Sequence, residues 1–293
     1  MTRIVVTGAH GQLGGAVVHE LARGHEVVPL GRADLDLTHD ADVRTAIARL
    51  RPDVVVNCAA YNDVDGAEDH PLDALDVNAF AVRTLAQAAA EAGAALVHYS
   101  TDFVFDGSAN APYTEQDRPN PRGVYAASKL LGEWFAADAP RAYILRVESL
   151  FGSVPPDRPP KGSLAGLLAA LLEGREARAF EDRVVSPTFV VDAAWATRRL
   201  LETTAPPGLY HCVNSGFATW VEVARELARQ LGVEPRIVPV RMADMTLKAA
   251  RPHYCVLSNA KLAEAGIVMP PWQDAIARYL KALPNVAVPR AAG

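Results

Sequence analysis

The chain has 293 residues, half of them hydrophobic and 22% charged, which is typical of a soluble globular protein with one large or two smaller domains. Its net charge of -5 and the lack of a basic cluster with interleaved aromatic residues argue against nucleic acid as a partner. The longest apolar stretch is shorter than the ~20 residues that a membrane span needs, and RIVVTG begins at Arg3, too early for a signal peptide. Three cysteines without paired spacing favour a reduced, cytoplasmic setting and no metal site.

The first half of the chain alternates short β-branched runs with longer helical patterns rich in alanine and leucine. This alternation predicts a Rossmann-type α/β fold, a doubly wound parallel sheet of about seven strands wrapped by helices. The segments, in chain order, are RIVVTG, QLGGAVVHELARG, EVVPLG, DADVRTAIARLRP, DVVVNCAA, PLDALDVNAFAVRTLAQAAAEAG, ALVHYSTDFVF, the helix opened by Tyr125, and AYILRVESLF.

The amino-acid composition changes beyond Gly152, where SVPPDRPPKGS is a proline-rich, turn-prone stretch. We expect a smaller α/β substrate-binding domain to separate here. Residues 1–150 and roughly 185–212 are assigned to a cofactor-binding domain, and roughly 151–184 and 213–293 to the substrate-binding domain. Helices are expected at Leu164 to Leu172 and within TWVEVARELARQLG.

A glycine-rich turn, TGAHGQLGG, stands between the first strand and the first helix and contains Gly8, Gly11 and Gly14. The first glycine permits a tight turn, the second lets the backbone approach a pyrophosphate, and the helix N-terminus stabilises its negative charge. The spacing alone also fits an ordinary strand-to-helix turn. In its strand-turn-helix setting it favours a dinucleotide site.

The segment after the second strand, LGRADLDLTHD, bears on the choice between NADP and NAD. Arg32 lies where a nucleotide 2'-phosphate would bind, and no acidic residue stands at the strand tip to hold a 2'-hydroxyl. This pattern favours NADP, although a solvated loop arginine explains Arg32 as well. Asp36 lies within reach of the adenine edge and is also a common turn former.

The stretch YAASK places Tyr125 and Lys129 four residues apart, on one face of the expected helix. A phenol has a reference pKa near ~10, and a neighbouring ammonium lowers that pKa by stabilising the phenolate. The same lysine is able to bind the ribose of a nicotinamide cofactor. Upstream, Ser100 and Thr101 end a strand at the sheet edge where ligands bind, so their hydroxyls fit either carbonyl polarisation or strand-end capping.

With these features in order, the chain resembles the extended short-chain dehydrogenase/reductases. Within them it is most similar to the dTDP-4-dehydrorhamnose reductase family, which reduces the C4 ketone of a nucleotide-linked 6-deoxyhexose. The resemblance covers most of the chain, through VTGAHGQLGG, VVVNCAAYNDVDGAED, VNAFAV, STDFVFDG, PYTEQDRPNPRGVYAASKLLGE, SPTF, GLYHCVNSG and RPHYCVLSNAKL. It implies an oxidoreductase that uses NADP(H), or NAD(H), on a nucleotide-sugar substrate, and it is compatible with a homodimer.

The resemblance also implies roles for individual residues. Thr101, Tyr125 and Lys129 form the implied catalytic set, with hydride passing to the keto carbon and Tyr125 delivering the proton. The implied cofactor-binding residues are Gly8, His10, Gly11, Gln12, Leu13, Gly14, Arg32, Asp36, Leu37, Cys58, Ala59, Ala60, Tyr61, Asn78, Tyr125 and Lys129, and the implied substrate-binding residues are Val104, Phe105, Glu148 and Arg251.

Rival functions are weighed on the same residues. Nucleotide-sugar dehydratases of the superfamily carry two acidic residues directly after the threonine, whereas Thr101 is followed by Asp102 and Phe103, which disfavours elimination. Two other functions remain as alternatives: an epimerase, and a regulatory subunit that binds the cofactor without turnover. The complete catalytic set favours an enzyme, because a binding module has no need to retain it.

The chain departs from the family's pattern after the ILR strand. A threonine, a serine and a tryptophan are usual there, whereas this chain reads ILRVESLFG, with Glu148, Ser149 and Leu150. The family's aromatic residue faces the substrate, so we expect the change to bear on the identity of the sugar or nucleotide. Asn62 likewise replaces a hydroxyl residue that is common in the family.

Overall fold

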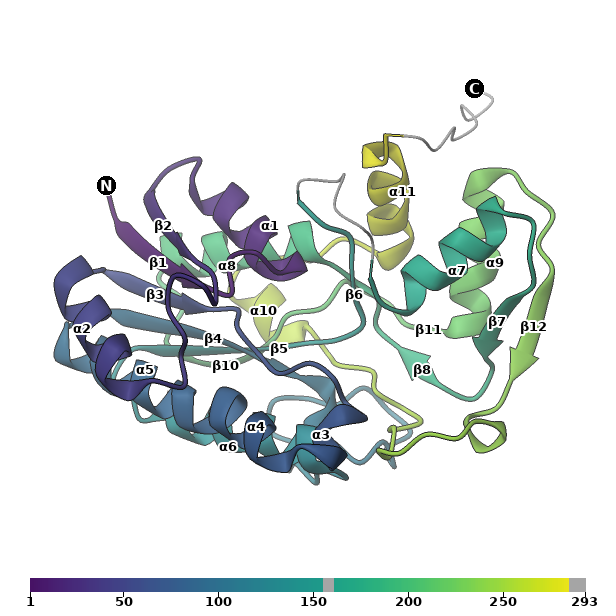
Figure 1. The fold of residues 1–293 in the computed structure, drawn as a ribbon. Helices are drawn as coiled ribbons and strands as arrows, with labels where there is room; N and C mark the ends of the chain where they lie inside the picture. Colours follow the sequence, from purple (N-terminus) through teal and green to yellow (C-terminus); the bar gives the residue numbers. More distant parts are fainter. Residues whose placement is uncertain (155–160, 285–293) are drawn as a thin grey trace.

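The computed structural model describes residues 1–154 and 161–284 and contains a parallel sheet of six strands (Figure 1). The strand order is β10-β5-β4-β3-β1-β2, so the chain moves outward in both directions from the centre of the sheet, as in a doubly wound fold. The strands are β1 (Arg3–Thr7), β2 (Glu26–Leu30), β3 (Val54–Asn57), β4 (Ala95–Thr101), β5 (Ala142–Val147) and β10 (Gly208–His211).

Helices cover both faces of this sheet because the central strands are apolar on both sides. One face packs against α1 (Gln12–Leu21) and α8 (Val190–Glu202). The other face packs against α2 (Asp40–Leu50), α5 (Ala81–Glu91) and α6 (Val124–Ala137). Short helical segments precede α5, namely α3 (Gly66–Asp69), α4 (Pro71–Leu75) and the π-helical turn η1 (Asp76–Phe80), and the 3-10 turn η2 (Asp102–Val104) follows β4.

The sheet has six strands, where about seven were expected, and the run AYILRVESLF divides into two strands of which β5 alone joins the sheet. Ser149 adopts a left-handed backbone conformation with φ 44°, which a strand does not accommodate. The chain therefore leaves the sheet after β5, and β6 (Leu150–Phe151) pairs with β9 (Thr188–Phe189).

The other elements form a smaller unit beside the sheet (Figure 1). Its helices α7 (Ser163–Leu172) and α9 (Trp220–Leu231) contain the two helices predicted from the sequence. Thr219 and Glu222 form a capping box that fixes the start of α9. The remaining elements are β7 (Ala177–Phe180), β8 (Val184–Val185), β11 (Ala218–Thr219), β12 (Ile237–Val240), the 3-10 turn η3 (Met242–Asp244) and α11 (Trp272–Ala282). The short helix α10 (Ala260–Glu264) is an exception, because it packs against β10 of the sheet.

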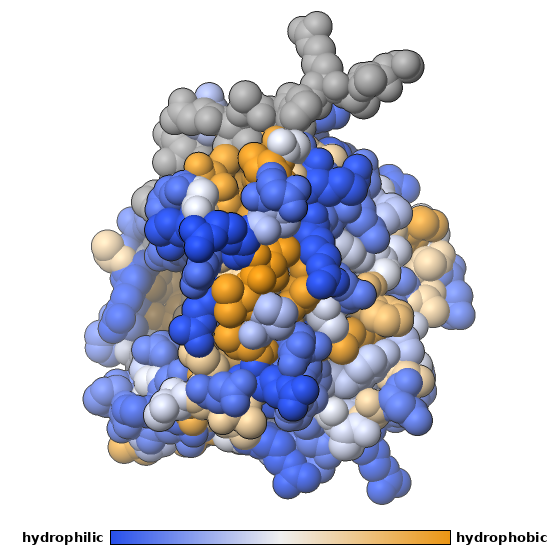
Figure 2. Space-filling model, turned by 90° about the vertical axis from the view of Figure 1, so that its right-hand side faces the viewer, coloured by the Kyte–Doolittle hydropathy of each residue, from blue (hydrophilic) through white to orange (hydrophobic). Residues whose placement is uncertain are grey.

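Figure 2 shows the end of the molecule made by this smaller unit, where hydrophobic residues gather near the centre of the face and hydrophilic residues surround them. The two-domain division stays a prediction, and the grouping of the elements supports it. Part of the proline-rich stretch, residues 155–160, and the end of the predicted small domain, residues 285–293, lie outside the described residues. No described helix is both long enough and apolar enough to span a bilayer.

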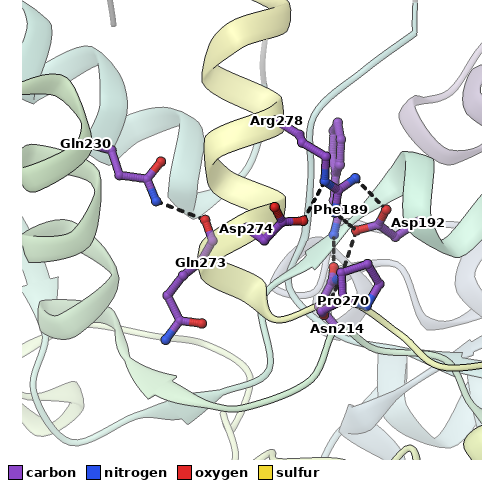
Figure 3. Close-up of polar contacts among 8 residues, drawn as sticks. All are labelled: Phe189, Asp192, Asn214, Gln230, Pro270, Gln273, Asp274 and Arg278. Carbon is purple, nitrogen blue, oxygen red and sulfur yellow. Dashed lines mark hydrogen bonds and ion pairs between the residues drawn. The ribbon is translucent and has the colours of Figure 1, made fainter. Parts of the chain in front are cut away.

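A polar network joins α11 to the start of α8 and so links the two parts of the molecule (Figure 3). The guanidinium of Arg278 donates to both carboxylate oxygens of the buried Asp192 at 2.7 Å. The same carboxylate accepts a 2.7 Å hydrogen bond from Asn214, which also donates to the carbonyl of Pro270. Bidentate, charge-assisted pairs of this kind fix orientation as well as adding stability.

Candidate active site

A cavity of about 430 Å³ lies at the carboxyl ends of β1, β3, β4 and β5, where ligands bind in doubly wound folds. Both parts of the molecule contribute to its wall. The wall residues are Gly11, Gln12, Leu13, Gly14, Cys58, Ala59, Ala60, Asn62, Val64, Tyr99, Ser100, Thr101, Asp102, Phe103, Tyr125, Lys129, Val147, Glu148, Ser149, Leu150, Gly162, Ser163, Arg183, Trp220 and Arg251.

The glycine turn forms one end of the cavity and is shaped as a dinucleotide cradle requires. Gly8 has φ 65°, and a Cβ there would lie 2.6 Å from the backbone nitrogen of Ala59. A Cβ on Gly14 would overlap the carbonyl oxygen of Gly8. Helix α1 begins at Gln12, so its first N–H groups point toward the cavity end where a pyrophosphate would bind. The residues present therefore fit a dinucleotide cofactor.

We expect Gly14→Ala to destabilise the protein by about 1–3 kcal/mol, because the added methyl group forces the turn apart. Urea unfolding measures the loss, and titration with NADPH measures the accompanying loss of cofactor affinity. Gly24→Ala is the matched control, since a Cβ at Gly24 meets no atom within 4 Å. Equal stability of the two variants would contradict the assigned role of the Gly8–Gly14 contact.

The loop after β2 holds the residues predicted to contact the adenosine end. Arg32 is 88% exposed in its side chain and forms a 3.5 Å ion pair with Asp36. Asp36 also accepts hydrogen bonds from the backbone and hydroxyl of Thr38, which lower the pKa of its carboxyl. The ring of His10 lies against Gly31. Leu37, by contrast, is buried in the hydrophobic core beneath this loop.

Asn78 is fully buried, and both the oxygen and the nitrogen of its side-chain amide form hydrogen bonds with other residues of the protein. Its oxygen accepts a 2.8 Å bond from the backbone of Tyr61, and its nitrogen donates to the carbonyl of Tyr61 and to Ser128 of α6. Asn78 therefore ties the loop after β3 to the helix that carries Tyr125. The sequence placed Asn78 on the cofactor, whereas these contacts give it a positioning role.

Three of the predicted residues meet at the centre of the cavity. Thr101 ends β4, while Tyr125 and Lys129 lie on α6, whose first turn is held by a 2.8 Å bond from the Val124 backbone to Glu68. All three side chains are buried and line the cavity. The structure thus brings the hydroxyl at the end of β4 together with the phenol and ammonium of α6.

The electrostatics of this group differ from the sequence expectation. Burial raises the pKa of Tyr125 to about 12, and hydrogen bonding with Thr101 only partly offsets this effect. Lys129 instead donates a 2.6 Å hydrogen bond to the carbonyl of Tyr99, and burial lowers the pKa of its ammonium to about 8. The expected lowering of the Tyr125 pKa by Lys129 is therefore wrong for this arrangement, because the ammonium is engaged by the backbone of β4.

Two predicted substrate-binding residues lie behind the cavity. Val104 and Phe105 belong to a separate hydrophobic cluster, in which Phe105 stacks on Tyr113 with ring centroids 4.0 Å apart. The turn η2 directs them into the core and leaves Phe103 in the cavity wall. The assignment of Val104 and Phe105 to the substrate is thus corrected to core packing.

Glu148 and Arg251, by contrast, do line the cavity. Arg251 forms a 2.9 Å ion pair with Asp65 and lies over the ring of Phe103. Glu148 is buried beside Asp102, and Cys255 completes a group whose oxygen and sulfur atoms all lie within 4.8 Å of one another. Arg183 also reaches this end of the cavity and bonds the sulfur of Cys255 at 3.9 Å.

Sequence reasoning missed Arg183 and Cys255 and assigned no acidic group to a metal. Both residues come from the smaller unit, far from Asp102 in sequence, and neither belongs to a recognisable local motif. The only sequence signal nearby was the unusual glutamate at Glu148. Cys255 also differs from a reactive thiol, since burial raises its pKa well above the usual value.

This fold and this site define a dehydrogenase/reductase of the extended short-chain class, with a Rossmann-type sheet and a Thr-Tyr-Lys group at its carboxyl edge. Comparison with known proteins is consistent with that class. The chain belongs to the RmlD substrate binding domain family, whose model matches residues 1–285.

Individual relatives span nearly the whole chain. It is 38% identical to the dTDP-4-dehydrorhamnose reductase of Streptomyces griseus, over 96% of this chain and 94% of that protein. A solved dTDP-4-dehydrorhamnose reductase from Clostridium acetobutylicum has a TM-score of 0.89 at 33% identity and covers 95% of this chain and 98% of its own. The corresponding enzyme from Bacillus anthracis, solved in complex with NADP, has a TM-score of 0.89 at 31% identity over 95% and 98% of the two chains.

Proposed function

We propose that this protein reduces the C4 ketone of a nucleotide-linked 4-keto-6-deoxysugar with NADPH, as a dTDP-4-dehydrorhamnose reductase does. The observation that carries the proposal is the convergence of Thr101, Tyr125 and Lys129 in one cavity beside a glycine cradle. The names of the relatives support the substrate class, and the complex of the Bacillus anthracis enzyme supports NADP. A cytoplasmic location and a homodimer are further parts of this proposal.

The proposed roles follow from the geometry. When bound, the cofactor supplies a hydride to the keto carbon. The buried hydroxyl of Thr101 hydrogen-bonds the substrate carbonyl and polarises it. Tyr125 donates its proton to the oxygen that gains negative charge, and the high pKa of the phenol keeps that proton in place until the charge develops. Lys129 supplies a positive charge and a donor beside Tyr125, where the ribose of the cofactor would bind.

The direct test is oxidation of NADPH on addition of dTDP-4-dehydrorhamnose, followed by identification of the sugar product. Stoichiometric formation of the 4-hydroxy sugar supports a ketoreductase. Binding of cofactor and nucleotide sugar without turnover would instead support the regulatory subunit. Interconversion of epimers without net NADPH consumption would support an epimerase.

We expect Arg32→Ala to raise KM for NADPH about tenfold while leaving KM for NADH nearly unchanged, because a charge-assisted contact to the 2'-phosphate is lost. Steady-state kinetics with both cofactors measure the change. Arg49→Ala provides a control, since Arg49 is an exposed arginine in the last turn of α2, at the end of that helix far from the loop after β2. If Arg32→Ala raises KM equally for NADPH and NADH, Arg32 does not bind the 2'-phosphate.

A further inference from the structure

Two buried carboxyl groups face each other at the substrate end of the cavity. Asp102 follows β4 and Glu148 follows β5, and these strands are neighbours in the sheet with Thr101 opposite Val147. Both side chains are almost fully buried, at 3% and 1% exposure. Among the described residues, Asp102 Oδ2 and Glu148 Oε1 have no hydrogen-bond partner. The other oxygen of Glu148 accepts a 2.7 Å bond from the Ser186 backbone.

The charges around the two carboxyl groups do not balance if both are ionised. Arg183 is a cation that acts on both of them, and its guanidinium donates a 3.9 Å hydrogen bond to the sulfur of Cys255. Among the described residues, Tyr254, Cys255 and Tyr125 are further titratable groups packed against the pair. Ionising both carboxyl groups at this short separation in a buried site has a high free-energy cost. Burial accordingly raises the pKa of both groups, with Asp102 raising that of Glu148 further.

A hydroxyl group connects this carboxyl pair to the proposed proton donor. Thr101 Oγ1 lies 2.9 Å from Asp102 Oδ1 and donates to it. The same hydroxyl hydrogen-bonds Tyr125. A hydroxyl both donates and accepts and is free to rotate, so it passes a proton by accepting one on its oxygen while releasing its own. The groups therefore form a row: Glu148, Asp102, Thr101, Tyr125.

We propose that Asp102 and Glu148 hold one proton between them and return it through the Thr101 hydroxyl to Tyr125 after each turnover. The inference rests on the proposed ketoreduction. Tyr125 gives its proton to the alkoxide of the product and becomes a phenolate. Thr101 then donates its proton to the phenolate while Asp102 protonates the Thr101 oxygen, and the pair regains a proton from solvent. No group is oxidised or reduced in these steps.

Glu148 acts through Asp102 and is a positioning residue in this scheme. It keeps a proton on the pair because two carboxyl groups this close in a buried site do not both ionise, and the neighbouring Asp102 raises the pKa of Glu148. The family that the chain resembles usually has no carboxylate at this point, where ILRVESLFG departs from its pattern. The proposed reservoir explains why a glutamate is tolerated in a buried wall.

Infrared spectroscopy tests the shared proton without any need for turnover. Wild-type protein at neutral pH is expected to show the carbonyl band of a buried, protonated carboxyl group, and Glu148→Gln is expected to lose it. Glu20→Gln is the matched control, because Glu20 is similarly buried but is ion-paired with both Arg23 and Arg198. A wild-type spectrum without the band, or a band that survives in both Glu148→Gln and Asp102→Asn, would overturn the proposal.

Kinetics test the use of the proton. Glu148→Gln removes the carboxyl group that holds the shared proton, so kcat is expected to drop about tenfold with KM unchanged. This loss is smaller than the roughly 10²- to 10⁴-fold contribution of a direct proton donor. The decline of kcat with rising pH is expected to shift to lower pH, and the solvent deuterium isotope effect to increase. Glu148→Asp, which restores a carboxyl group, is expected to recover most of the activity.

The outcomes separate this inference from the proposed function. If the wild type turns over and Glu148→Gln has an unchanged pH profile, the proton reservoir is contradicted and the proposed ketoreductase activity is not. If the wild type shows the infrared band but no turnover, the proposed ketoreductase activity is contradicted and the shared proton is not. Stoichiometric Zn²⁺ binding that abolishes the band and requires both Glu148 and Cys255 would mark the group as a metal site and contradict the reservoir.

Discussion

Tyr125→Phe is expected to lower kcat for NADPH-dependent reduction by about 10²- to 10⁴-fold, the range that positioned general acids contribute. The variant loses the phenol proton but keeps the aromatic ring, which packs edge-on against Phe103 with centroids 5.6 Å apart. The cavity wall and the cofactor cradle are therefore expected to be preserved. Stopped-flow and steady-state measurements of NADPH oxidation check the effect.

The control for this variant is Tyr143→Phe. Tyr143 lies on β5 away from the cavity, and its hydroxyl donates a 3.1 Å hydrogen bond to the carbonyl of Ala205. Its replacement is expected to cost about 1 kcal/mol of stability and to leave kcat unchanged. If Tyr125→Phe binds NADPH normally and turns over within a factor of two of wild type, Tyr125 is not the proton donor.

Glu133→Gln is expected to reduce the free energy of unfolding by about 3–5 kcal/mol. Glu133 on α6 accepts two hydrogen bonds from Arg146 on β5, at 2.8 and 2.7 Å, and both side chains are buried. The amide leaves the guanidinium of Arg146 buried and uncompensated. His211 lies 3.4 Å from Arg146 but has no negative charge to replace the carboxylate, and burial and the charge of Arg146 lower its own pKa to about 3. Urea denaturation measures the loss.

Two further variants isolate the cause of that loss. Glu133→Leu combined with Arg146→Leu removes both charges and is expected to be far less destabilised than Glu133→Gln alone. Glu173→Gln breaks an ion pair with Arg175 in which both side chains are 58% exposed, and it is expected to change stability very little because solvent screens the pair. A loss in Glu133→Gln no larger than that in Glu173→Gln would show that Arg146 is not electrostatically dependent on Glu133.

Local patterns in the sequence were sufficient for much of the fold and for part of the site. The alternation of β-branched and helical segments predicted the parallel sheet, and the spacing of Gly8, Gly11 and Gly14 predicted the turn that the structure shows. The spacing of Tyr125 and Lys129 placed both on one face of α6. Such features depend on neighbours within one or two turns, which a sequence displays directly.

Features that depend on tertiary structure were not accessible in the same way. The break at Ser149 depends on one left-handed residue, which composition does not reveal. The burial of Phe105 depends on the direction of η2 and on Tyr113 as its stacking partner. The placement of Arg183 and Cys255 beside Asp102 requires the smaller unit to pack against the sheet. The hydrogen bond from Lys129 to the β4 backbone likewise needed coordinates.

The network around Asp192 has a consequence for biosynthesis. Asp192 is translated 86 residues before Arg278, its bidentate partner in α11. Until α11 has left the ribosome, the Asp192 carboxylate has no Arg278 guanidinium to neutralise it. The sheet therefore folds first without this ion pair to the smaller unit. The link between the two parts through this ion pair therefore forms only after α11 has been translated.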